Sequence, residues 1–265
     1  MYISLDNTPY YIYTGTHEPK PELETIVFVH GASMDHSVWS HQSRYFAYHG
    51  YNVLAVDLPG HRFSKGKLLS NIEDIAKWIL QILNCVNCRA IHLVGHSMGA
   101  LAALEAASQL RSDIHHLKTL SLVGFCYPMR VTPALLNAAK NNPSKAYSMM
   151  TQWSHASKTG GEPVPGFWSA GMQMSMMENN QIEAIHCNLE ACNNYLGGEQ
   201  AFARVECPIL FISGKLDKMA PAKLAIREAE RIKNSRIQII DGCGHNIMFE
   251  SPDGVLNSLN QFIRR

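Results

Sequence analysis

The chain has 265 residues, 46% of them hydrophobic, and a formal net charge of +1 from 23 Lys and Arg against 22 Asp and Glu. This length suits one large α/β domain with a sizeable core and requires no second domain. A balanced charge creates no extended field of one sign, so we expect neither nucleic acid nor an anionic membrane as a partner.

Seven cysteines, an odd number scattered along the chain, do not make a disulfide framework. No stretch approaches the roughly 18 apolar residues of a membrane span. The N-terminus lacks the basic start and apolar block of a secretory signal. We therefore expect a cytoplasmic protein, and the sequence leaves its oligomeric state open.

Segments 2–5 and 10–13 alternate apolar and polar residues, which predicts two antiparallel strands. Short apolar runs then recur, as is typical of strands buried on both faces of a parallel sheet. These runs cover residues 26–29, 53–56, 91–94, 120–123, 209–212 and 237–240. Helical patterns lie between them, at about 37–48, 72–83, 98–110, 221–232 and 252–263. This alternation predicts a doubly wound, mostly parallel α/β sheet.

The alternation stops between residues 126 and 204. This segment has no convincing strand and contains five prolines, at positions 128, 133, 143, 163 and 165. We interpret it as a helical cap inserted after a core strand and lying over the sheet. The predicted organisation is a core of residues 1–125 and 205–265 interrupted by a cap of residues 126–204.

Residues 95–99 read Gly-His-Ser-Met-Gly and match the pattern G-x-S-x-G. The pattern follows a predicted strand and opens a helix rich in small residues. A serine at such a tight strand-to-helix turn takes a strained backbone conformation that exposes its hydroxyl at the sheet edge. We therefore expect Ser97 to be a nucleophile.

A serine hydroxyl is a poor nucleophile without a base. His245 stands on the glycine-rich segment 242–246, just after the last predicted strand, and is our candidate base. Asp217 follows the strand at 209–212 and is our candidate for the acid that orients the imidazole. Asp57 also follows a strand, but the Leu-Pro-Gly after it indicates a tight turn that Asp57 stabilises. The order Ser, Asp, His suits this kind of sheet.

Two backbone N–H groups are the expected donors to a developing oxyanion. One belongs to Met98, directly after the nucleophile, and the other to Ala32, in the loop after the strand at 26–29. Gly31 lets that loop approach a substrate closely. The alternative interpretation of the His-Gly pair before Ala32 is a plain turn.

Five segments together resemble the α/β-hydrolase superfamily, specifically its bacterial single-domain esterase-like members: 27–31, 57–61, 95–99, 214–217 and 242–245. The resemblance implies an acyl-enzyme mechanism with Ser97 as nucleophile, His245 as proton shuttle and Asp217 as orienting acid, without a cofactor or metal. The chain has Arg62 where similar members often have glycine. It has small Ala32 where several subfamilies have a bulky aromatic residue.

Methionines and aromatic residues concentrate in the predicted cap. Methionine adapts to irregular apolar shapes and aromatic rings make rigid walls, so we expect an apolar acyl or alkoxy pocket beneath a mobile lid. The alternative is simple packing of the cap onto the core. The expected pocket residues are Met149, Trp153, Phe167, Trp168 and Met172.

The leading hypothesis is a hydrolase of small-molecule carboxylic esters. The same triad serves thioesterases, lactonases, amidases, carbon–carbon bond hydrolases and hydroxynitrile lyases, so these activities remain open. Epoxide hydrolases and dehalogenases are disfavoured, because their nucleophile is a carboxylate at the position of Ser97. A non-enzymatic receptor on this fold would bind a ligand with negligible turnover, and a pure interaction domain gives no reason to keep the three groups together.

Overall fold

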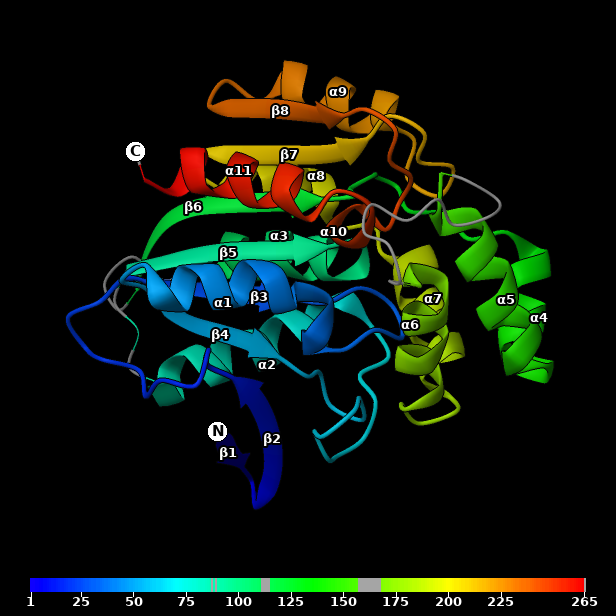
Figure 1. The fold of residues 1–265 in the computed structure, drawn as a ribbon, viewed down its shortest axis with the longest axis horizontal. Coiled ribbons are helices and arrows are strands. Elements are labelled where there is room, and N and C mark those ends of the chain that lie inside the picture. The colour runs from blue at the N-terminus through cyan, green and yellow to red at the C-terminus, as the bar shows by residue number, and fades with distance from the viewer. Residues whose placement is uncertain (87, 89, 111–114, 157–167, 265) are drawn as a thin grey trace.

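The computed structural model describes residues 1–86, 88, 90–110, 115–156 and 168–264. Eight strands form one sheet in the order β1-β2-β4-β3-β5-β6-β7-β8 (Figure 1). The β1–β2 and β2–β4 pairs are antiparallel, and every pair from β4 through β3, β5, β6 and β7 to β8 is parallel, which confirms the predicted, mostly parallel sheet. The strands are β1 (Tyr2–Leu5), β2 (Thr8–Tyr13), β3 (Thr25–Val29), β4 (Asn52–Val56), β5 (Ala90–His96), β6 (His116–Val123), β7 (Ile209–Gly214) and β8 (Ser235–Ile240).

Helices cover both faces of this sheet. α1 (Ser40–Tyr48) and α11 (Pro252–Ile263) lie in front of it in Figure 1, while α2 (Ile72–Val86), α3 (Met98–Gln109) and α8 (Gly198–Arg204) lie behind it. α9 (Ala222–Arg231) packs against β7 and β8. Successive side chains of a strand point to opposite faces, and β3 shows the result. Ile26 and Phe28 join the core under α1 and α11, and Val27 and Val29 join the core under α2 and α3.

Because β3 and β4 are central, all five residues of each strand are buried, as their continuous apolar runs predict. β8 stands at the edge of the sheet and behaves differently. Its residues alternate between more and less exposed positions, and Arg236 and Gln238 are exposed. An edge strand contacts fewer helices, so only one of its faces needs an apolar pattern.

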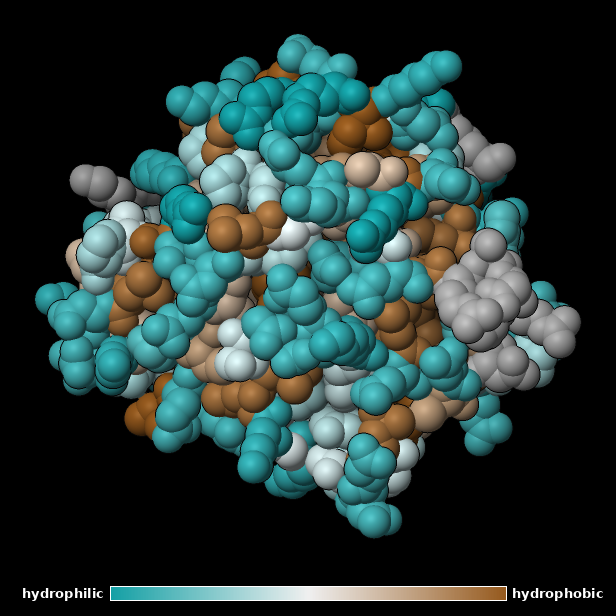
Figure 2. Space-filling view, turned by 180° about the vertical axis from the view of Figure 1, so that it is seen from behind, coloured by the Kyte–Doolittle hydropathy of each residue, from teal (hydrophilic) through white to brown (hydrophobic). Residues whose placement is uncertain are grey.

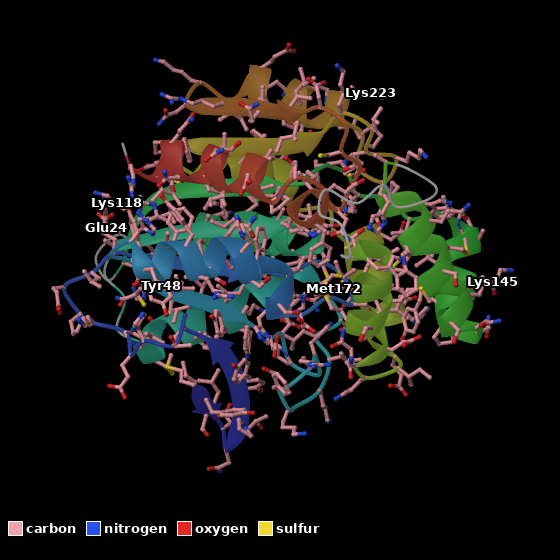
Figure 3. The ribbon with its side chains drawn as sticks, viewed as in Figure 1. Glu24, Tyr48, Lys118, Lys145, Met172 and Lys223 are labelled. Carbon is pink, nitrogen blue, oxygen red and sulfur yellow. The ribbon has the colours of Figure 1, made fainter. Side chains whose placement is uncertain are left out.

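Four helices between β6 and β7 lie beyond the carboxyl ends of the parallel strands, where a cap was expected (Figure 1). They are α4 (Pro133–Asn141), α5 (Pro143–Ser154), α6 (Ser169–Glu178) and α7 (Ala184–Asn194). Lys145 lies on α5, exposed on the outer side of this cap (Figure 3). α8 falls within the range 126–204 but packs mainly against α3 of the core.

Polar residues cover most of the face drawn in Figure 2, with smaller hydrophobic patches between them. At the edge of the sheet opposite the cap, Glu24 and Lys118 form an exposed ion pair with 3.7 Å between Nζ and Oε1 (Figure 3). None of the helices in the described ranges is both long and apolar enough to cross a bilayer.

The close contact between β5, α3 and β3 requires glycine at two positions. A Cβ on Gly95 would lie 2.1 Å from the carbonyl oxygen of Gly99, and a Cβ on Gly99 would lie 2.4 Å from that of Val29. Both obstacles are backbone atoms, which cannot move aside without shifting the strand or the helix. The turn between β5 and α3 therefore depends on these two glycines.

We predict that Gly95→Ala lowers the free energy of unfolding by about 3 kcal/mol or more, because backbone must shift to relieve the collision. Urea unfolding followed by circular dichroism measures this. The matched control is Gly50→Ala, where φ is +86° but no atom lies within 4 Å of the added Cβ. At position 50 only the left-handed backbone conformation disfavours alanine, and we expect the free energy of unfolding to fall by about 1 kcal/mol. Equal losses in both variants would contradict the packing argument.

Candidate active site

The turn from β5 to α3 holds Ser97 in a conformation that few side chains adopt. Its φ is +53° and its ψ is −117°, and its backbone N–H donates to the carbonyl oxygen of Val123 at 2.9 Å. Such strain persists only where the surrounding structure enforces it, and it is frequent at functional sites. Here it directs the hydroxyl into the space between the sheet edge and the cap.

The structure brings the three residues expected to act together within hydrogen-bonding distance. His245 Nε2 lies 2.9 Å from Ser97 Oγ, and His245 Nδ1 lies 2.7 Å from Asp217 Oδ2. All three side chains are buried. Because a carboxylate only accepts, Nδ1 carries the proton in this arrangement, and Nε2 is left to accept the proton of the serine hydroxyl.

The carboxylate of Asp217 is held by its own loop. Its Oδ1 accepts hydrogen bonds from the backbone N–H groups of Met219 at 2.8 Å and Ala220 at 2.7 Å. The other oxygen, Oδ2, is thereby directed at the imidazole of His245. Fixed donors on one oxygen keep the second oriented, so the imidazole ring is held in a defined position.

Two groups that sequence reasoning did not single out hold the backbone of His245. His96 Nε2 donates to the carbonyl oxygen of His245 at 3.0 Å, and the N–H of His245 donates to the carbonyl oxygen of Ser154 at 2.7 Å. Ser154 ends α5, so a helix of the cap holds the backbone of His245 in place. His96 was visible as the second residue of the G-x-S-x-G pattern, whereas no sequence signal marked Ser154.

The carboxylate of Glu250 reinforces the same junction. It accepts from the N–H of Ala156 and from the N–H of Gly244, both at 2.7 Å, and so links the segment directly after α5 to the loop before His245. Burial is the main cause that raises the pKa of Glu250 above its usual range, although both N–H donors oppose the shift.

Of the two expected oxyanion donors, Met98 follows Ser97 directly in the chain and Ala32 lines the same pocket as Ser97 and His245. Met98 is the first residue of α3, where a backbone N–H has no partner within the helix. Ala32 is buried. These positions are compatible with the expected role of the two N–H groups as donors to an oxyanion.

Two asparagines of the cap hold the loop that contains Ala32. Asn188 Oδ1 accepts from the N–H of Ser33 and from His61 Nε2, each at 2.8 Å. Asn180 Nδ2 donates to the carbonyl oxygen of Ser33, and its Oδ1 accepts from the N–H of Arg62, again at 2.8 Å. Ser33 and Arg62 both have positive φ, so these bonds stabilise unfavourable backbone conformations. Arg62 thus occupies the left-handed conformation for which glycine is favoured.

A pocket of about 140 Å³ opens beside the hydroxyl of Ser97. Of the four expected pocket residues that the structure describes, Trp153 alone lines it, and Met149 packs instead against the neighbouring core. Trp168 and Met172 are 67% and 37% exposed and do not line it; Figure 3 shows Met172 on α6. Phe167 lies outside the described residues.

The apolar wall of the pocket comes mostly from residues that composition did not distinguish. A count of methionines and aromatics in the cap cannot tell which face of each helix is turned toward the nucleophile, and that face decides the lining. The wall is formed by Met129, Leu135, Met150, Leu189 and Met219.

Asp35, His36 and Asp57 are the one group among the described residues with ligand atoms close enough to hold a metal ion. Their atoms already bind one another and the local backbone. Asp57 Oδ1 lies 2.8 Å from both the backbone N and Nδ1 of His36, and Asp35 Oδ1 accepts from the N–H of Ser37. This arrangement fastens the turn after β3 to the loop after β4, so Asp57 acts as a loop residue.

Two cysteines near the site carry protonated thiols. Burial, with a smaller contribution from Asp217, raises the pKa of Cys126 to about 12. Burial likewise raises the pKa of Cys192, which lines the pocket, far above its usual range. Since the thiolate is the reactive form, neither group competes with Ser97 as a nucleophile.

Comparison with known proteins agrees with this geometry. The sequence profile of the alpha/beta hydrolase family matches residues 26–258, and the chain belongs to this family of hydrolytic enzymes. The resemblance noted from the sequence motifs is therefore confirmed.

Similar proteins differ in what they act on. An Acinetobacter baylyi protein named (E)-2-((N-methylformamido)methylene)succinate hydrolase is 24% identical over 277 residues, covering 99% of this chain and 97% of that protein. A solved thermophilic esterase matches 100% of this chain and 96% of its own, at 23% identity and a TM-score of 0.82. The solved enol-lactonase of Burkholderia xenovorans LB400 matches 100% of this chain and 100% of its own, at 19% identity and a TM-score of 0.84. Both solved structures share the fold.

The site contains buried histidines that stay neutral. Burial lowers the pKa of His96 to about 3, with a further contribution from the neighbouring His245. Burial also lowers the pKa values of His30 and His61. In the unfolded chain these rings take up a proton near pH 6.5, so below that pH the unfolded state binds more protons than the folded state. The contribution of His96 to stability is complete above about pH 6.5 and is lost progressively as the pH falls toward 3.

We therefore predict that His96→Gln flattens the acid branch of the stability profile. The glutamine Nε2 retains the donor to the carbonyl oxygen of His245 but does not titrate. Between about pH 7 and pH 5 the native protein should lose roughly 2 kcal/mol more free energy of unfolding than the variant. Urea titrations at both pH values measure the difference. The exposed His116→Gln should leave the profile unchanged, and the same slope in native protein and H96Q would contradict the prediction.

Proposed function

We propose that this chain hydrolyses carboxylic esters of small molecules through Ser97, His245 and Asp217, with a covalent acyl-enzyme intermediate. The observation that carries the proposal is the continuous hydrogen-bonded series from Ser97 Oγ through the imidazole to Asp217 Oδ2, at 2.9 and 2.7 Å. Family membership supports hydrolytic chemistry in general. The residue roles and the preference for esters are our inference.

In this mechanism the serine oxygen attacks the ester carbonyl carbon while His245 Nε2 takes the hydroxyl proton. The carbonyl oxygen becomes an oxyanion, stabilised by the N–H groups of Ala32 and Met98. The intermediate collapses, the C–O bond to the alkoxy group breaks, and the imidazolium returns its proton to the leaving alcohol. Asp217 stabilises the imidazolium and keeps its tautomer correct.

The second half of the reaction repeats these steps with water. His245 removes a proton from a water molecule as its oxygen attacks the acyl carbon, and the proton then passes to Ser97 Oγ as the acid leaves. Ester and water are consumed, and acid and alcohol are formed, so no redox partner or cofactor enters the balance. Thioesters, lactones and activated carbon–carbon bonds are alternative substrates for the same three groups, and the similarity to an enol-lactonase keeps the lactone among them.

We predict that Ser97→Ala abolishes hydrolysis of 4-nitrophenyl esters, since no other group at the site can form the acyl-enzyme. Asp217→Asn should lower kcat by about 10⁴-fold, because an amide favours the wrong tautomer of His245. A fluorophosphonate probe followed by mass mapping should label Ser97 in the native protein and nothing in the alanine variant.

Ser148→Ala, on the exposed side of α5, is the control for the effect of removing a hydroxyl without touching the site. Circular dichroism should show that all variants are folded. Activity retained by Ser97→Ala, or a probe adduct on another residue, would overturn the assignment. A panel of matched ester, thioester and lactone substrates then decides between the activities that share this triad.

The apolar wall of the pocket leads to a separate prediction about chain length. Each methylene that passes from water to the wall of Met129, Leu135 and Leu189 contributes up to about 0.8 kcal/mol to transition-state binding. We expect kcat/KM for 4-nitrophenyl esters to rise severalfold from acetate to butyrate. Leu135→Ala should flatten this rise. A native profile that is level or falls with chain length would count against an apolar acyl pocket.

A further inference from the structure

The pocket beside Ser97 has two basic residues and no acidic residue among the described residues that line it. Arg130 comes from the segment between β6 and α4, and Lys218 comes from the loop after β7, directly after Asp217. Both side chains are exposed, and neither has an ion-pair partner in the described part of the chain. We refer to Arg130 and Lys218 as the basic rim.

Arg130 is held through its side chain, whereas Lys218 is held through the turn that contains its backbone. Arg130 donates one guanidinium N–H to the carbonyl oxygen of Asn193, at the end of α7, at 2.9 Å. The remaining N–H groups of the guanidinium stay available, and their planar arrangement suits a carboxylate. Lys218 sits between Asp217 and Met219, in the turn fastened by the Asp217 carboxylate.

The start of α4 adds to the positive potential of the same pocket. Thr132 lines the pocket and caps this helix by accepting from the N–H of Leu135 at 3.3 Å. A helix N-terminus carries a partial positive charge and favours anions. The contribution of α4 supplements the two full charges and would not define a site without them.

The three kinds of surface that line the pocket indicate the chemistry of the ligand. They are the pair Ser97 and His245, an apolar wall that includes Leu135 and Trp153, and the exposed basic rim. A substrate that satisfies all three has a scissile carbonyl, a short apolar spacer and an anionic end. A purely apolar chain would leave the basic rim without a partner.

We propose that the natural substrates are anionic esters whose acyl chain ends in a carboxylate, and that Arg130 and Lys218 bind this carboxylate. This inference rests on the proposed function and specifies its substrate class. Because both rim side chains are exposed, water and salt weaken each contact, and the preference comes from two cations acting on one carboxylate. The two basic residues are specificity determinants and take no part in bond breaking.

The test compares two substrates that differ only at the end of the acyl chain: 4-nitrophenyl hexanoate and mono-4-nitrophenyl adipate. The measured quantity is kcat/KM for the adipate divided by kcat/KM for the hexanoate, after subtraction of uncatalysed hydrolysis. The native enzyme should prefer the anionic ester. Arg130→Gln and Lys218→Gln should each lower the ratio by up to about fivefold, as expected for the loss of one exposed charge pair.

The matched control is Lys215→Gln. Lys215 belongs to the same loop as Lys218 and its removal changes the net charge equally, but it pairs with Asp241 at 2.6 Å and does not line the pocket. This variant should leave the ratio within about twofold of the native value, since long-range attraction between exposed charges is screened by salt. A drop in K215Q as large as in K218Q would show general electrostatic steering and overturn the rim assignment.

A binding measurement separates this inference from the proposed function. Calorimetric titration of Ser97→Ala with monomethyl adipate should give binding that weakens by up to about fivefold when Arg130→Gln is added. If the hexanoate ester is hydrolysed through Ser97 but the ratio is the same in native, R130Q and K218Q proteins, only the substrate class is wrong. If neither ester reacts and the fluorophosphonate probe does not label Ser97, the proposed function is wrong, and the calorimetric result alone decides whether the rim binds carboxylates.

Discussion

The pair of hydrogen bonds made by one imidazole ring is the interaction on which the remainder of this structure depends. His245 contacts Asp217 through one nitrogen and Ser97 through the other, at 2.7 and 2.9 Å. A ring placed in this way has one tautomer that satisfies both neighbours. The parallel strands place these residues at their carboxyl ends, and loops from three strands meet there because neighbouring parallel strands end at the same edge.

Residues of the cap form hydrogen bonds with the loops that build the candidate site. The carbonyl oxygen of Ser154 holds the backbone of His245, and Asn188 and Asn180 hold the loop that contains Ala32. These contacts are buried or partly buried, where a lost hydrogen bond is costly because its partner remains desolvated. The described part of the cap is therefore anchored to the core at both the His245 loop and the Ala32 loop.

The three residues proposed for the chemistry and the residues that line the pocket come from different parts of the chain. Ser97, Asp217 and His245 belong to the core, whereas the pocket wall comes largely from the cap and from the segment that leads into it. Arg130 and Lys218 represent both parts, since Arg130 precedes the first cap helix and Lys218 directly follows Asp217. This division is consistent with one family of related folds acting on chemically different substrates.

The sheet, its flanking helices and the positions of Ser97, Asp217 and His245 could be predicted from sequence, because strand runs, a G-x-S-x-G turn and strand-end loops are local patterns. The lining of the pocket could not be predicted in this way. Trp153 lines the pocket beside Ser97, while Trp168 and Met172, equally conspicuous in composition, are exposed. The hydrogen bonds by which His96 and Ser154 hold the backbone of His245 could not be predicted from sequence either. The His96 bond joins residues 149 positions apart. Local patterns determine which elements form, but only their packing decides which distant side chains meet.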